Sequence, residues 1–345
     1  MQNGGSSFHG FITALVLLSL LPLCGCGRKS GNEKQAVIRT VTLDTLSIIN
    51  EEVRIQDIHV DDCHIVLLTS GNPMLYILDK NTGDVMKRTC FVGHASNEYL
   101  MTPHSINVRN HQAQFMDRSR KQMCYISLLD FGQKRRDVPY TANFRPARAV
   151  DVDGSLVCVG SFSQGRIGFV KTDNTMEVPD YDYPYDTGDV EGIYRGSLYQ
   201  SEILVPECGN QCFVYSLASD SFEIYKCMSG VLEKVYASPV NYAPVVNKSG
   251  SRHMVDYNRS KAGIIHASVT DSSIFCMFST MSYNEAARSG FKGDRITEFG
   301  WDGSRKAEYC LPVMSSSFCV DDEFFYVVCE GHDESVVIRV HRERG

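Results

Sequence analysis

The feature that most constrains this sequence is a unit that recurs along it: an apolar run, a turn rich in Asp, Asn and Gly, and a second apolar run. Residues 75–84 (LYILDKNTGD) contain one such turn, and residues 212–220 (CFVYSLASD) contain another. Short runs rich in Val, Ile, Tyr and Phe between turn residues predict strands and hairpins, and helical periodicity is almost absent. We therefore expect an all-β chain.

The units recur with a regular period. They begin near Ile55, His104, Arg148, Glu191, Ile264 and Phe318. Spacings of roughly 40 to 50 residues in an all-β chain are typical of a β-propeller, in which each blade is a four-stranded sheet. Because one blade cannot bury both of its faces, neighbouring blades must close into a ring. Six starts predict a six-bladed β-propeller over residues 37–345. A pair of β-sandwiches is the alternative fold, and the regular period counts against it.

Two of the repeats depart from the regular spacing. The last repeat is short, so we expect a strand at Val37–Leu43 to complete it and to close the ring with strands from both ends of the chain. The fourth interval is long and contains Val231–Arg259, with the polar stretch 247–253. This segment is predicted to be an insertion loop on one face of the ring.

The first residues predict an exported protein. Residues 11–27 read FITALVLLSLLPLCGCG, an apolar run too short for the roughly 20 residues of a membrane-spanning helix. The Leu-Cys-Gly-Cys ending is typical of a bacterial lipoprotein signal, which predicts a signal peptide over 1–25, lipid attachment at Cys26 and a polar tether over 26–36. Cys24 is the alternative attachment site, and a signal cut without lipidation remains open. The first ten residues contain no Lys or Arg, so the true start codon also stays open.

Composition excludes some classes of function. The net charge is −7, and no stripe of Lys and Arg interleaved with aromatic residues is present, which argues against nucleic-acid binding. Five of the 13 cysteines are expected to be small buried hydrophobes, because they lie in apolar runs. Members of this group are Cys63, Cys158, Cys276, Cys319 and Cys329. Cys208 and Cys212 flank a turn, where a disulfide is one alternative; a zinc site lacks a second Cys/His pair at metal spacing.

Three stretches resemble the TolB-like six-bladed propeller lipoproteins of Gram-negative bacteria. They are residues 296–311 (ITEFGWDGSRKAEYCL), 317–326 (SFCVDDEFFY) and 91–100 (FVGHASNEYL). The third matches a glycine-rich loop of the family in a degraded form, with Gly93 and Glu98 retained. The resemblance spans most of the mature chain and implies the six-bladed fold. It implies little about activity, because propellers host many unrelated functions.

The sequence offers few catalytic patterns: it has no G-x-S-x-G nucleophile elbow and no H-E-x-x-H helix. An acidic loop at 179–191 could offer oxygen ligands to calcium, but its spacing does not match an EF-hand. Its carboxylates are Asp180, Asp182, Asp186, Asp189 and Glu191, and its aromatic residues Tyr181, Tyr183 and Tyr185 suit contact with a partner. The single tryptophan, Trp301, lies in a hairpin and is expected to be structural.

Candidate ligand-binding residues are polar side chains predicted on the innermost strands, which line the channel of a propeller. They are His59, His104, Arg148, Glu191 and His266. Such a ring could bind an anionic or sugar-like ligand, or hold a metal through its histidines. The alternative is that each residue is hydrogen-bonded within its own blade. We assign no catalytic residue, no resident metal and no cofactor.

The leading functional hypothesis is a lipid-anchored envelope protein that binds an unidentified protein partner or ligand without catalysis. Since no acidic run follows Cys26, we favour the periplasmic face of the outer membrane over the cell surface. The alternative is a metal-assisted hydrolase or a polysaccharide-active enzyme that uses the channel residues. A third hypothesis is a purely structural assembly subunit.

Overall fold

The computed structural model describes most of the chain after residue 42. The described residues are 43–49, 53–162, 164–186, 190, 195–196, 198–228, 231–249, 252–331 and 334–342. The predicted signal, tether and lipid-attachment residue lie outside them. We describe the unit formed by residues 35–345 by itself.

Within the described residues, the strands pair into six four-stranded antiparallel sheets and one two-stranded sheet. The innermost strands are β2 (Ile55–Val60), β6 (Asn107–Arg109), β10 (Phe144–Val152), β14 (Ser201–Leu204), β20 (Lys261–Val269) and β24 (Ser317–Val320). The second strands are β3 (His64–Thr69), β7 (Gln112–Asp117), β11 (Ser155–Phe162), β15 (Gln211–Ser216), β21 (Ile274–Ser282) and β25 (Phe324–Glu330). The third strands are β4 (Leu75–Asp79), β8 (Gln122–Ser127), β12 (Ile167–Val170), β16 (Phe222–Met228), β22 (Gly293–Phe299) and β26 (Ser335–His341). The outermost strands are β5 (Val85–Thr89), β9 (Gln133–Asp137), β13 (Met176–Glu177), β17 (Val231–Ala237), β23 (Arg305–Ser315) and β1 (Leu43–Ile49).

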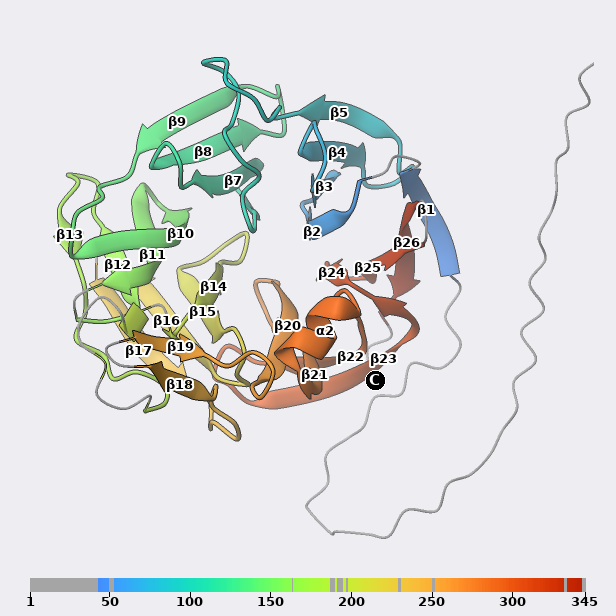
Figure 1. The fold of residues 1–345 in the computed structure, drawn as a ribbon. Helices are drawn as coiled ribbons and strands as arrows, with labels where there is room; N and C mark the ends of the chain where they lie inside the picture. The colour runs from blue at the N-terminus through green and yellow to red at the C-terminus, as the bar shows by residue number, and fades with distance from the viewer. Residues whose placement is uncertain are drawn as a thin grey trace, which may run out of the picture. The chain divides into compact units, whose positions relative to one another are not determined.

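The sheets follow one another around a ring as blades 1 to 6, which begin at β2, β6, β10, β14, β20 and β24 (Figure 1). The predicted six-bladed propeller is confirmed, and the sandwich alternative is excluded. The ring is also closed as expected, because β1 is the outermost strand of blade 6 and pairs with β26 from Leu43↔Val340 to Ile49↔Ser335. This closing strand begins where the predicted segment Val37–Leu43 ends, and residues 37–42 lie outside the described residues.

The core is divided among the contacts between blades. Six hydrophobic clusters of described residues each join two neighbouring blades. In the cluster that joins blades 6 and 1, Leu67 and Tyr76 pack with Tyr326 and Val328, and all four are almost fully buried. The middle strands are covered on both faces by neighbouring blades. This explains why β3 and β4 are continuous apolar runs instead of alternating ones.

The boundaries of blade 4 differ from the prediction. Its first strand begins at Ser201, ten residues after the expected start at Glu191, and Glu191 lies outside the described residues. The predicted insertion at Val231–Arg259 is also partly wrong, because β17 is the outermost strand of blade 4 and pairs with β16. The inserted part is the later hairpin of β18 (Val246–Ser249) and β19 (Arg252–Val255).

The hairpin has an internal partner in the tyrosine-rich segment before blade 4. Tyr185 and Tyr199 stack with ring centroids 4.6 Å apart, and their cluster packs against Val246 and Val255. The Tyr181 hydroxyl donates to the Leu232 carbonyl over 2.7 Å. These tyrosines therefore pack against other parts of the same chain, and their contact with a partner stays a prediction.

The cysteines are free thiols wherever the structure describes them, including Cys208 and Cys212. Cys158, Cys276 and Cys319 are buried as expected, whereas Cys329 is only partly buried. Cys63 is exposed, contrary to the prediction, because it lies in the turn after β2 and not within a strand. Trp301 lies in the turn between β22 and β23, where its indole nitrogen donates to the Thr270 carbonyl over 3.1 Å.

Candidate functional site

The two ends of the ring are built differently. Every blade is antiparallel, and the chain enters it at its innermost strand. The connection from the first to the second strand of a blade and the connection from its third to its fourth strand therefore lie at the same end of the ring, which we call the turn side. They are short, as at 110–111 and 153–154. The opposite end, which we call the loop side, carries the connections between successive blades and the connection from the second to the third strand within each blade. The long ones are 90–106, 178–200 and 238–260, together with 283–292, which contains the helix α2 (Tyr283–Arg288).

A cavity of about 520 Å³ opens on the loop side, and residues of blades 1 to 5 line it. Its polar wall includes His104, Arg118, Arg148 and Glu202, and Tyr283 and Phe291 line it from the α2 segment. Helix α2 begins with a capping box in which Ser282 accepts from the Glu285 backbone and the Glu285 side chain returns to the Ser282 backbone. This cap fixes the start of the helix, where Tyr283 lies.

An ion pair joins two blades on the polar wall. Arg148 of β10 contacts Glu202 of β14, and the Ser105 hydroxyl donates to the same carboxylate over 3.1 Å. Burial raises the pKa of Glu202 above its ordinary value, and the attraction of Arg148 offsets this only in part. The pair holds the Arg148 guanidinium at the cavity.

His104 lies close to two guanidinium groups. Its pKa is lowered from the ordinary value of a histidine by desolvation and by the positive charges of Arg148 and Arg118. Arg118 is exposed in the turn between β7 and β8, and it lines the cavity. This part of the wall is therefore electropositive.

Asp57 of β2 also lines this cavity, and it accepts from donors of blade 1, of blade 5 and of the connection that leads into blade 2. His59 Nε2 lies 3.3 Å from its Oδ2, and His266 Nε2 of β20 lies 3.2 Å from its Oδ1. The backbone amides of Ile58 and Ile106 also donate to this carboxylate, over 3.0 and 3.1 Å. Burial alone would raise the pKa of Asp57, but the charge of His59 and the hydrogen bonds from both histidines hold it far below its usual range. An ionised carboxylate only accepts, so both ring nitrogens donate.

Further hydrogen bonds cross the channel between blade 2 and blade 4, which are not neighbours in the ring. Asn107 of β6 donates to the Ile203 carbonyl over 3.2 Å and accepts from the Val205 amide over 3.4 Å. The buried guanidinium of Arg109 donates to the carbonyls of Pro206 and Gly209. With the Asp57–His266 contact, these bonds divide the channel into two separate cavities.

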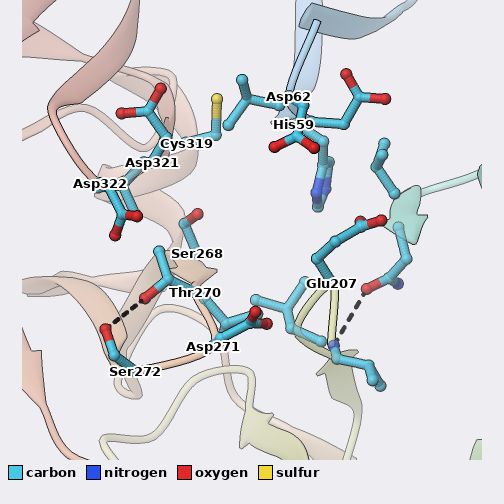
Figure 2. A pocket seen from close by; sticks show the side chains of 18 of the residues that line it. His59, Asp62, Glu207, Ser268, Thr270, Asp271, Ser272, Cys319, Asp321 and Asp322 are labelled. Carbon is cyan, nitrogen blue, oxygen red and sulfur yellow. Dashed lines mark hydrogen bonds between the residues drawn. The ribbon is translucent and has the colours of Figure 1, made fainter. Parts of the chain in front are cut away.

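The turn-side cavity has a volume of about 350 Å³ and an acidic lining. Figure 2 shows His59 with Asp62, Glu207, Asp271, Asp321 and Asp322 around it. Lys80 pairs with Asp321 over 2.8 Å. Over the part of the chain that the structure describes, no group of three or more His, Cys, Asp or Glu side chains is arranged to hold a metal ion.

The structure therefore separates the five predicted ligand-binding residues. His104, Arg148 and His266 line the loop-side cavity, His59 lines the turn-side cavity, and Glu191 lies outside the described residues. Three charged residues of this region were not predicted from the sequence: Asp57, Arg118 and Glu202. Asp57 precedes His59 by two positions in one strand, and strand periodicity could have indicated it. Arg118 lies in a turn whose sequence does not distinguish it from other charged turns.

The family model and one solved structure agree with this architecture. The family model described as TolB-like 6-blade propeller-like matches residues 51–323. A crystal structure of a Bacteroides fragilis protein described as exported superposes with a TM-score of 0.59 at 12% identity, covering 89% of this chain and 95% of that one. The β-propeller domain of Cps50 (Swd1) from Myceliophteria thermophila gives a TM-score of 0.44 at 10% identity, over 83% of this chain and 82% of that chain. No curated protein sequence matches the chain.

No helix in the described residues is long and apolar enough to cross a membrane.

The six four-stranded blades, the ring closed by β1 and the family match over residues 51–323 lead to one conclusion. This chain belongs to the TolB-like six-bladed propeller family.

Proposed function

We propose that this propeller is a lipid-anchored protein of the cell envelope that binds a ligand, or a segment of a partner protein, in its loop-side cavity without chemical turnover. Support comes from the family, from the fold shared with a Bacteroides fragilis protein described as exported, and from the lipoprotein-like sequence that ends at Cys26. A lipid on Cys26 would hold the propeller at the periplasmic face of the outer membrane without a spanning helix.

The observation that carries the binding proposal is the loop-side cavity itself. Its volume of about 520 Å³ lies within the usual range of ligand sites, and a few polar groups converge in it. The long connections of the ring also lie on this side, whereas the connections on the turn side are short hairpin turns. Binding residues are commonly carried by loops on a rigid scaffold, and this asymmetry favours the loop side.

The enzymatic alternative requires histidine and carboxylate groups that converge at a cavity mouth and are free to react. Asp57, His59 and His266 do converge, but the Asp57 carboxylate already accepts from four donors. We interpret this cluster as a set of structural contacts that hold the blades together at the centre of the ring. We therefore propose binding in preference to catalysis.

The anchor is tested with matched cysteine variants. We expect Cys26→Ala to prevent incorporation of radiolabelled fatty acid and to release the protein from the membrane fraction, while Cys24→Ala leaves labelling unchanged. The reverse pattern would assign the lipid to Cys24, and labelling of neither residue in the wild-type protein would contradict the anchor.

The binding site is tested by filling each cavity in turn. Gln56 and Ser272 are both exposed; Gln56 lines the loop-side cavity and Ser272 the turn-side cavity. We expect Gln56→Trp to lose the ligand or partner recovered with the wild-type protein from envelope extracts, as measured by native mass spectrometry. Ser272→Trp should retain it. Loss in Ser272→Trp alone would move the site to the acidic turn side and contradict the proposal.

A further inference from the structure

The charged residues that line the loop-side cavity are two arginines, Arg118 and Arg148, and two carboxylates, Asp57 and Glu202. Among the described residues, Arg148 has one charged partner, Glu202, and Arg118 has neither an ion pair nor a hydrogen bond. Both guanidinium groups lie close enough to His104 to disfavour its protonation. Asp57 already accepts from four donors, and Glu202 pairs with Arg148. Arg118 is therefore left without a charged partner among the described residues, and its wall suits an anion.

The opposite wall has a different chemistry. Tyr283 and Phe291 of the α2 segment meet edge to face with ring centroids 5.1 Å apart, and Tyr257 backs Tyr283 at 4.6 Å. The segment belongs to blade 5, whereas Arg118 belongs to blade 2, which lies across the ring (Figure 1). A ligand that reached both walls would place a charged end on the arginines and a ring or apolar body on the aromatic side chains.

The geometry of guanidinium groups indicates which anion fits. Arginine presents planar, paired donors that match a carboxylate or a phosphate, and neutral His104 adds one further donor beside them. A carboxylate carries one negative charge and so balances the one guanidinium that has no charged partner, whereas a phosphate monoester carries up to about two. A neutral sugar would leave the charge of Arg118 unused. A cation would be repelled by the arginines.

From these observations we infer that the loop-side cavity binds an organic acid, with its carboxylate against Arg118, Arg148 and His104 and its ring against Tyr283 and Phe291. This inference rests on the proposed function, since it names the class of ligand for the same site. The ring of the acid belongs either to a sugar or to an aromatic molecule, and the test separates the two sources.

The test is calorimetric titration of the purified full chain with two matched pairs of probes, glucuronate with glucose and phenylacetate with phenylacetamide. We expect the acid of one pair to bind at least about tenfold more tightly than its neutral analogue. Arg118→Ala should weaken the binding of that acid by about tenfold. The control is Arg295→Ala, because the Arg295 side chain is 68% exposed and lies outside the cavity.

Equal binding of the acid and its neutral analogue would overturn the inference, as would acid binding that Arg118→Ala leaves unchanged. If neither acid binds while Gln56→Trp still abolishes the capture of a ligand or partner, the inference fails and the proposed function stands. If Gln56→Trp has no effect either, both fail. Arg118 is exposed and unpaired among the described residues, so its removal should not unfold the protein.

Discussion

At the scale of single residues, Asp57 connects several segments at the centre of the ring. Its carboxylate has a side-chain exposure of 9% and accepts from His59, His266 and two backbone amides. We expect Asp57→Asn to lower the free energy of unfolding by roughly 3 kcal/mol, because the amide has one acceptor oxygen and leaves buried donors unpaired.

The measurement is urea unfolding followed by circular dichroism. Asp62→Asn is the matched control, since Asp62 is an exposed aspartate in the turn after the same strand. It should change the free energy of unfolding by less than about 0.5 kcal/mol. Equal effects of the two substitutions would contradict the structural role of Asp57.

Asp57 also predicts a pH dependence. Its pKa is lower in the folded state than in the unfolded chain, so its contribution to stability is fully present above the unfolded value, near pH 4. That contribution is lost as the pH falls further, towards the folded pKa. The stability difference between wild type and Asp57→Asn should therefore shrink below about pH 4. A difference that stays constant from pH 7 to pH 3 would argue against an ionised Asp57.

At the scale of structural elements, a buried network fastens blade 3 to blade 4. Arg166, just before β12, contacts Glu223 of β16 and donates to the hydroxyls of Ser201 and Ser216 over 2.8 and 2.7 Å. Lys234 of β17 pairs with the other oxygen of Glu223 over 2.7 Å. The attraction of these two cations outweighs burial and lowers the pKa of Glu223.

Removing one partner of this network should be costly. We expect Arg166→Ala to lower the free energy of unfolding by about 3–5 kcal/mol, because Glu223 loses its buried partner. Arg295→Ala, which removes an exposed arginine, should cost less than about 1 kcal/mol. Denaturant titration checks both values, and a cost for Arg166→Ala no larger than that of the control would show that the network does not fasten the blades.

The elements that the sequence predicted well are those with a strong local signal. Ile55, Ile264 and Phe318 each lie within or at the start of an innermost strand, because apolar runs bounded by turn residues mark the blades. Blade 4 was predicted less well. Its preceding segment contains Tyr185 and Tyr199, whose burial depends on contact with the distant β18–β19 hairpin. Such a long-range contact leaves no periodic pattern in the sequence from which it could be predicted.

At the scale of the whole molecule, β1 joins the two ends of the propeller. We expect a chain that begins at Val53, and so lacks β1, to unfold at least roughly 10 °C lower than a chain that begins at Gln35. Without β1, the strand β26 becomes an unpaired edge that favours aggregation. Thermal unfolding followed by circular dichroism compares the two chains, and equal midpoints would show that closure contributes little.

The candidate site was predicted in part. Polar residues on innermost strands were expected at the channel, and Arg148 and His266 do lie on such strands and line one cavity. His104 lines the same cavity, but from the connection before β6 and not from an innermost strand as predicted. The division of the channel could not be predicted, because it depends on contacts such as Asn107 with Val205, which are almost a hundred residues apart. Which cavity each side chain reaches therefore follows only from the assembled ring.

The central claim is that the loop side of the ring is the binding face. Hydrogen exchange tests it most directly, by comparing the full-length protein in native membrane fractions with the purified protein. We predict slower exchange of backbone amides in 90–106, 178–200, 238–260 and 283–292, and unchanged exchange in the turn-side connections. Protection confined to the turns around Asp271 and Asp321, or no difference between the two samples, would contradict the claim.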